Sequence, residues 1–476
     1  MTRWHTPTAA VRAAVAHADP EQQKLRQWAH RCMDTAAATG HAIVLTIPAP
    51  AVTAETLLLV EPETLGLLWQ SRPDTTFSSL GAAQELRAYG AGRFGEIQRQ
   101  AADLWREWTS AWYGDARPPP VRLVGGFAFR EGGARHPPWQ GFGDAWFVLP
   151  RLRYDVAGDR AWLSRAIPRD EIGRGVRRAA ALEELLAVRA ALPAVACKLT
   201  RCRPSSALVR SEPQNVTGWT TLVEEIAQGI SSGLFQKVVA ARRSVLEFDA
   251  PPDPLGVLRR LQSGPPGSTR FAFRRPEATF LGATPERLVA QSKGEIQTEA
   301  LAGSTRSDQP GAAARLLSSR KERAEHDFVV QTLLERLRPV CEVTPPRAQP
   351  EVHAVRHLLH LRTPIRAQRL QPGHVLDLVA CIHPTPAVGG VPTEVAIRWI
   401  EKHEPVARGW YAGPVGWFEP SGDGEFAVAL RSGLLRQKFA YLYAGAGIVR
   451  DSEPPSELAE TNLKLATLHD ALGVVP

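Results

Sequence analysis

The chain has 476 residues, of which 44% are hydrophobic and 22% are charged, proportions that are typical of a globular protein. No run approaches 18 apolar residues, which excludes a transmembrane helix, and the start lacks the apolar core of a secretory signal. The net charge of +8 raises nucleic-acid binding as a hypothesis, but it comes from scattered arginines without a zinc-finger, helix-turn-helix or RNP-type signature. Five cysteines without CxxC or zinc spacing indicate reduced thiols, so we expect a cytoplasmic protein that binds neither nucleic acid nor a membrane.

The first half of the chain, residues 1–215, mixes helical segments with strands such as HAIVLTIP and AWFVLPRLRYD. Short proline-rich stretches, for example DARPPPVRL and DAPPDPLG, are flanked by patterned sequence and predict loops rather than flexible linkers. No motif in this half indicates catalysis by itself.

The second half contains clearer elements. TGWTTLVEEIAQGISSG predicts a helix that ends at a glycine, and LFQKVVAARRSVLEF, TRFAFRR and ATFLGA predict strands. AAARLLSSRKERAEHDFVVQTLLERLR predicts one long helix or two, and GEFAVALRSGLLRQKFAYLYAGAGIV predicts two strands joined by a polar turn. Strands and helices mix without a regular βαβ alternation, which favours an α+β fold.

Two residues beside predicted strands are candidates for proton transfer. Lys237 shares one strand face with Phe235, Val239 and Ala241, so we expect it to be partly buried, and burial favours the neutral amine that a general base requires. Glu286 follows a strand and a turn, where catalytic groups often lie. The pattern leaves two alternatives open: a lysine that extends from a sheet edge, and a carboxylate at a helix start.

A set of carboxylates raises the question of a metal site. SEPPSELAETNLKLA predicts a helix on which Glu457, Glu460 and Lys464 share one face, and Glu325 lies at the end of an apolar stripe on an earlier helix. Like charges so placed repel each other, and Mg²⁺, which binds one or two protein carboxylates and keeps several waters, would relieve that repulsion. A solvated acidic face is the alternative, and we expect the neighbouring His326 to be a core residue rather than a ligand.

Further residues indicate an anionic ligand. Arg431 alternates with Glu425, Ala427 and Ala429 on a predicted strand face and could hold a carboxylate in bidentate fashion. The stretches LAGS, at the end of a predicted strand, and YAGAGIV contain small residues whose backbone a ligand could approach closely, although tight packing explains them equally well. Together these features predict a carboxylate-bearing substrate, a divalent ion, one base and one acid.

Nine stretches resemble, in order, the chorismate-utilising enzymes and within them the isochorismate synthases: FQKVVAAR, GATPERL, ALAGSTR, KERAEHDFVV, HLRTPI, HPTPAVGGVPTEVA, RGWYAGPVGW, AVALRSGLL and AGAGIVRDSEPPSELAETNLK. The resemblance covers about residues 216–472 and is loose before them. It implies one large α+β catalytic domain over 1–476, like anthranilate synthase component I, with two stacked, mostly antiparallel sheets flanked by helices. Residues 1–215 would complete the core, and residues 216–476 would bind chorismate.

The resemblance also implies a magnesium-dependent reaction in which water adds at C2 of chorismate and the C4 hydroxyl leaves. The isochorismate formed would feed menaquinone or catechol siderophore synthesis. Lys237 would activate the water, and Glu286 would protonate the leaving hydroxyl, which requires a pKa raised by burial. Glu325 and Glu460 would hold Mg²⁺, with Glu457 beside them. Tyr411 and Arg431 would bind the pyruvyl carboxylate, and the substrate site would also include Gly303, Ser304, Ala387, Gly445, Ala446, Gly447 and Lys464.

The chain departs from the ammonia-using relatives. These typically read GSVTGAPK where this chain reads PAVGGVPT, so Ala387 replaces a threonine and Thr393 replaces a lysine. The branch that uses a covalent lysine reads PIKGT, and Ala302 stands in place of that lysine. These differences favour water as the nucleophile and predict no glutaminase subunit; the family resemblance predicts a monomer. Salicylate synthase is an alternative, and a non-catalytic basic binding protein is a distant one.

Overall fold

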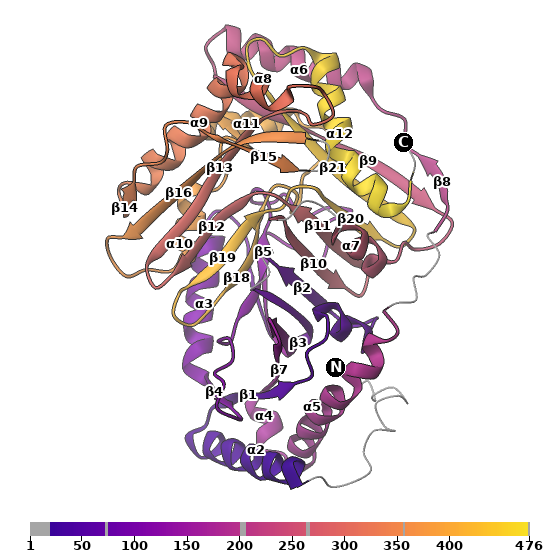
Figure 1. Cartoon of the computed structure of the whole chain (residues 1–476), viewed down its shortest axis with the longest axis vertical. Helices are drawn as coiled ribbons and strands as arrows, with labels where there is room; N and C mark the ends of the chain where they lie inside the picture. Colours follow the sequence, from indigo (N-terminus) through magenta and orange to yellow (C-terminus); the bar gives the residue numbers. More distant parts are fainter. Residues whose placement is uncertain (1–19, 72–74, 200–205, 263–266, 356–357, 475–476) are drawn as a thin grey trace.

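The computed structural model describes residues 20–71, 75–199, 206–262, 267–355 and 358–474. Figure 1 shows the first half of the chain in its lower part and most of the second half above it. The helices are α2 (Pro20–Thr39), α3 (Arg93–Glu107), α4 (Arg169–Ile172), α5 (Gly175–Ala196), α6 (Val216–Ser231), α7 (Pro254–Gln262), α8 (Ala312–Ser318), α9 (Arg320–Leu337), α10 (Val375–Ile382), α11 (Thr393–His403) and α12 (Pro454–Leu472), with a 3-10 turn, η1 (Ala54–Leu59).

The described strands belong to one hydrogen-bonded network. They are β1 (Ala42–Ala49), β2 (Gly66–Gln70), β3 (Thr76–Ala88), β4 (Trp108–Trp112), β5 (Leu123–Phe127), β6 (Ala145–Ala157), β7 (Arg160–Ile167), β8 (Leu208–Ser211), β9 (Lys237–Phe248), β10 (Thr269–Arg275), β11 (Ala278–Thr284), β12 (Arg287–Ser292), β13 (Glu295–Arg306), β14 (Cys341–Thr344), β15 (Glu351–Val355), β16 (Leu358–Arg369), β17 (Gly390–Val391), β18 (Pro414–Phe418), β19 (Gly424–Val428), β20 (Ser432–Arg436) and β21 (Phe439–Ile448).

Strand pairing joins the two halves of the chain. β2 pairs with β10, and β5 pairs with β18, both in antiparallel register. The pair β1–β4 is parallel, and the other pairings between the described strands are antiparallel. The prediction of an α+β fold with mostly antiparallel strands and flanking helices is confirmed, with the strands linked continuously rather than divided into two separate sheets.

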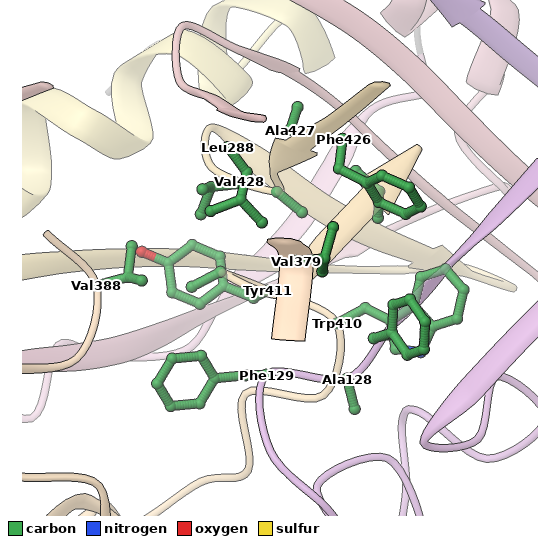
Figure 2. Close-up of a cluster of buried hydrophobic side chains, with 14 of the residues drawn as sticks. Ala128, Phe129, Leu288, Val379, Val388, Trp410, Tyr411, Phe426, Ala427 and Val428 are labelled. Atoms are coloured by element: carbon green, nitrogen blue, oxygen red, sulfur yellow. The ribbon is translucent and has the colours of Figure 1, made fainter. Parts of the chain in front are cut away.

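The strands bury both of their faces, because successive side chains point to opposite sides. On β10, Phe271 and Phe273 lie in one hydrophobic cluster and Ala272 lies in the other. The first cluster is rich in aromatic rings; Figure 2 shows Phe129, Trp410 and other members of it as sticks. The second cluster lies under α2, α5, α7 and α12, which contribute apolar residues to it. The strands therefore lie between the two hydrophobic clusters.

Local sequence signals explain several helix boundaries. The side chain of Asn215 accepts a hydrogen bond from Gly218 N and so caps α6, which ends before Gly233 at φ +77°. The long helical stretch divides into α8 and α9 at Ser319, which caps α9. The predicted C-terminal helix is α12, which begins with two prolines and ends at Leu472, followed by the C-cap Gly473 at φ +75°.

The prediction of two strands between residues 424 and 449 was wrong, because β19, β20 and β21 occupy this stretch. The additional break lies at residues 429–431, where the chain turns before β20. Within the described residues, no helix is both long and apolar enough to cross a membrane.

Candidate active site

Lys237 is the first residue of β9, and its side chain has no exposed surface. Its Nζ donates a 2.8 Å hydrogen bond to Oε1 of Glu325 on α9. A Cβ added at Gly447 would lie 2.5 Å from Glu325 Oε1 and 2.9 Å from Lys237 Cε, so the ion pair leaves room for glycine alone at this position. The expected burial of Lys237 is confirmed.

Two further lysine–glutamate pairs lie on α9 and α12. Lys321 Nζ lies 3.1 Å from Glu457 Oε1, and Lys464 Nζ lies 2.5 Å from Glu460 Oε1. Lys464 also donates a 2.8 Å hydrogen bond to the carbonyl of Gly445. Together with the pair described above, all three glutamates expected at a metal have a lysine partner, so lysine charges offset the repulsion that their spacing suggested.

Burial and neighbouring charges act in opposite directions on the carboxyls of α12. Burial raises the pKa of Glu457, and the nearby Glu460 charge adds to the rise. Burial acts in the same direction on Glu460, but the charge of Lys464 and hydrogen bonds from Lys464 and Ser304 outweigh it, so the pKa of Glu460 is lowered. The exposed fraction of the side chain is 3% for Glu457, 16% for Glu325 and 29% for Glu460. Glu325 and Glu460 are therefore the carboxylates that a cation from solvent reaches more easily.

Glu286 lies in the short link between β11 and β12 and is 3% exposed. Burial raises the pKa of its carboxyl to about 8, and the charge of Glu299 adds to the rise. The positive charges of Lys237 and Arg431 and the nearby Thr385 hydroxyl act in the opposite direction without cancelling the rise. Glu286 is thus protonated at neutral pH, and the expected increase in its pKa is confirmed.

Arg431 does not lie on a strand, contrary to the predicted alternation with Glu425, Ala427 and Ala429. β19 ends at Val428, and Arg431 occupies the following turn with φ +47°. This left-handed conformation is uncommon for a residue with a side chain, and such residues are concentrated at functional sites. The turn, rather than strand alternation, therefore orients the buried guanidinium.

The Arg431 guanidinium lies beside two other buried polar groups. Its Nη2 is 3.4 Å from Nε2 of His360; burial first, and then the charges of Arg431 and Lys464, lower the pKa of His360 to about 3. The ring of Tyr411 stacks on Tyr443 with 5.3 Å between centroids, and burial raises the pKa of Tyr411 to about 12. A cation, a neutral imidazole and a phenol hydroxyl are thus available to bind an anion.

Gly303 and Ser304 lie inside β13 rather than at its end, because the strand continues to Arg306. The register against β16 shifts between Ala302 and Ser304, and Gly303 adopts φ +76° at this bulge. Ser304 N donates a 2.7 Å hydrogen bond to Oε2 of Glu322, on the first turn of α9. The expectation of a strand end was therefore wrong, and a β-bulge opens the backbone here.

The remaining small residues form an apolar wall. A Cβ added at Gly445 would lie 3.4 Å from the hydroxyl of Tyr411, so the backbone of β21 approaches this ring closely. Ala446 is fully buried in the aromatic cluster, and Ala387, in the loop after α10, packs against the same cluster. Figure 2 shows Tyr411 near Val388 within this cluster. The structure thus places Ala387 and Ala446 in the hydrophobic wall rather than among the charged groups.

The chemistry of the donor set fits a hard cation. Burial, and then the charge of Glu325, raises the pKa of Glu322 to about 7, and Glu460 contributes in the same direction. These carboxyls therefore lie within electrostatic reach of each other. Among the residues that the structure describes, no three His, Cys, Asp or Glu side chains form a group that could hold a metal ion together. Mg²⁺ takes one or two protein carboxylates and keeps several waters, so it does not require three protein ligands together.

Sequence reasoning missed three residues at this site: Glu322, His360 and Thr385. Glu322 lies three residues before Glu325, a helical spacing that could have revealed it. His360 is opposite Ser304 in the β13–β16 pairing, and no sequence pattern places it there. His326, by contrast, is buried and contacts Thr363 Oγ1 at 2.8 Å, so the expectation of a core histidine is confirmed.

Comparisons with known proteins show the family of the chain. Residues 30–473 match the family described as chorismate binding enzyme. The salicylate biosynthesis isochorismate synthase of Pseudomonas aeruginosa is 36% identical over 419 residues, which cover 86% of this chain and 85% of that relative. Isochorismate synthase MenF of Bacillus subtilis is 34% identical over 360 residues, 74% of each chain. The solved structure of MenF, the menaquinone-specific isochorismate synthase from Escherichia coli, has a TM-score of 0.72 at 26% identity and covers 94% of this chain and 99% of that chain.

The chain therefore belongs to the chorismate binding enzyme family. The relatives reported above are isochorismate synthases, so the resemblance to that branch and the expectation of an enzyme are confirmed.

Proposed function

We propose that this enzyme isomerises chorismate to isochorismate. A water oxygen bonds to C2 and gives up a proton, the ring double bonds shift, and the C4–O bond breaks as the leaving hydroxyl takes a proton. Water enters and water leaves, so substrate and product are isomers. The reaction needs one base and one acid, each worth about 10²–10⁴-fold in rate.

The observation that carries the proposal is the buried, protonated Glu286 within electrostatic reach of Lys237. Hydroxide is a poor leaving group, and a carboxyl with a pKa of about 8 holds a proton for it at neutral pH. Lys237 is buried against Glu325 and, as the neutral amine, would take the proton from the attacking water. An acid in the link between β11 and β12 and a base on β9, both buried, suit attack and departure at two positions of one ring.

Substrate anions would be held by the remaining groups. Arg431 and Tyr411 would bind the pyruvyl carboxylate, since both are buried and neither has a carboxylate within hydrogen-bond distance among the described residues. Glu325 and Glu460 would hold Mg²⁺, with Glu457 beside them, and Lys464 would balance their charge. When bound, the ion supplies positive charge for the ring carboxylate of chorismate.

The metabolic pathway is also part of this proposal. Isochorismate would feed menaquinone or catechol siderophore synthesis in the cytoplasm. The name of the Pseudomonas aeruginosa relative refers to salicylate biosynthesis, which keeps salicylate formation as a second candidate. That activity would share the first step and then eliminate pyruvate from isochorismate.

The experiment incubates purified protein with chorismate and Mg²⁺, with and without EDTA, and resolves the products by HPLC. We expect isochorismate in equilibrium with chorismate, and loss of turnover on chelation. Salicylate with pyruvate would support the second candidate. Full turnover in EDTA would contradict the role of Mg²⁺, and no turnover would contradict the proposed reaction.

A further inference from the structure

The loop that joins α10 to α11 brings an unused hydroxyl to Glu286. Thr385 is 3% exposed, and its Oγ1 has no well-formed hydrogen bond within the described parts of the chain. The hydroxyl nevertheless lies near the Glu286 carboxyl. Burial has the largest effect on the pKa of that carboxyl and raises it, whereas Thr385 lowers it. A buried hydroxyl without a hydrogen-bond partner costs free energy. Other contacts must therefore hold the loop that carries Thr385 in this position.

One arginine spans both ends of this loop. Arg336, in the last turn of α9, donates from Nη1 to the carbonyls of Ile382 at 3.0 Å and Pro384 at 3.1 Å. Its Nη2 donates to Oγ1 of Thr393 at 2.6 Å, at the start of α11. The planar guanidinium offers several donors in a fixed geometry, so a single side chain ties together both ends of residues 382–393.

The rest of the loop is held by its backbone. Val388 N and Gly389 N donate to the carbonyl of Thr385 at 3.1 and 2.9 Å. Val239 N on β9 donates to the carbonyl of Gly389 at 2.8 Å, and Arg408 donates to the carbonyl of Val388 at 2.7 Å. These bonds tie the loop to the strand that carries the candidate base. None of these hydrogen bonds uses the Thr385 hydroxyl, which therefore stays available to the Glu286 carboxyl.

We propose that Arg336 and Thr393 are positioning residues that clamp the 382–393 loop and so hold the Thr385 hydroxyl against the Glu286 carboxyl. The inference rests on the proposed function, because Glu286 is the acid of that reaction. In this clamp, the Thr393 hydroxyl accepts a hydrogen bond from the positively charged Arg336 guanidinium. A lysine, which the ammonia-using relatives typically carry at this position, has no acceptor and would repel Arg336.

The clamp is tested with graded variants. Arg336→Met removes all three hydrogen bonds, and we expect kcat to fall about 10²-fold, the effect of a misplacement of roughly 1 Å. Thr393→Val removes one acceptor and should lower kcat about tenfold, whereas Thr393→Ser keeps the hydroxyl and should stay within about twofold of wild type. Arg338→Met is the matched control, since Arg338 is exposed two residues further along the same chain segment.

Two readouts separate positioning from a purely structural role. In Arg336→Met and Thr385→Val, the alkaline limb of kcat/KM should move to higher pH, because Glu286 loses the hydroxyl that lowers its pKa. Glu299, Lys237 and Arg431 also face Glu286 and stay unchanged. A structural role would lower the thermal midpoint and the active fraction while leaving the limb in place, and that result would overturn the proposal.

Hydrogen exchange tests the clamp without turnover. Backbone amides of residues 382–393 should exchange faster in Arg336→Met than in wild type or Arg338→Met; equal exchange would refute the clamp. If wild type does not convert chorismate, the proposed reaction fails, and the exchange experiment still decides whether Arg336 holds the loop.

Discussion

Two regions of the site give the same kind of side chain opposite charge states. On α12, Glu460 lies 2.5 Å from Lys464, and its pKa is lowered although it is partly buried. Between β11 and β12, Glu286 is deeply buried, and its pKa rises to about 8. Lys237 affects Glu286 through its charge, but its hydrogen bond goes to Glu325. For these two residues, the lysine at hydrogen-bond distance distinguishes the carboxylate from the acid. Glu457 shows that burial can outweigh such a partner, because its pKa is raised although Lys321 lies 3.1 Å away.

The largest effect should come from Glu286→Gln, which keeps the shape of the side chain and removes the acid. We expect kcat to fall about 10²–10⁴-fold while the affinity for chorismate, measured by calorimetry, stays nearly unchanged. Glu295→Gln, an exposed change on β13, is the control. Substantial kcat in Glu286→Gln would assign the acid elsewhere.

Lys237→Ala removes the candidate base and should lower kcat by a comparable or slightly smaller factor, about 10²–10³-fold. Chorismate binding should again survive, because the residues proposed to hold its carboxylates are untouched. The measurement is single-turnover HPLC at saturating chorismate. Wild-type turnover in Lys237→Ala would show that water is activated without this amine.

Glu460→Ala tests the role of the ionised glutamate on α12. We expect the Mg²⁺ concentration for half-maximal activity to rise about 10–100-fold, and Mg²⁺ binding measured by calorimetry to weaken in parallel. Glu453→Ala, an exposed change beside the start of the same helix, should have no effect. An unchanged requirement for Mg²⁺ would remove Glu460 from the metal site.

The smallest effect is the pH dependence of the wild-type enzyme. Glu286 acts in its protonated form, so kcat/KM should decline above pH about 8, approaching tenfold per pH unit. The same raised pKa affects folding: its contribution to stability is complete below the ordinary pKa of 4.5 and is lost as the pH rises through about 8. A flat profile from pH 7 to 9.5 would contradict the assignment.

Much of the fold could be read from local patterns. The helix at 454–472, the break that yields α8 and α9, and the burial of Lys237 all follow from periodicity and capping, which depend on neighbouring residues. The bulge at Gly303 and the turn at Arg431 were missed. A bulge is defined by pairing with another strand, and a positive φ at arginine persists only when surrounding contacts impose it.

The sequence by itself determined which residue types are available and on which faces of their elements they lie. It placed carboxylates at the edge of a helix face and a lysine on a buried strand, since these depend on spacing alone. Only the tertiary structure decided the partners: Lys237 meets Glu325 across 88 positions, and Lys321 meets Glu457 across 136. Charge states follow partners and burial, so the protonated Glu286 and the ionised Glu460 could be distinguished only once the chain was folded.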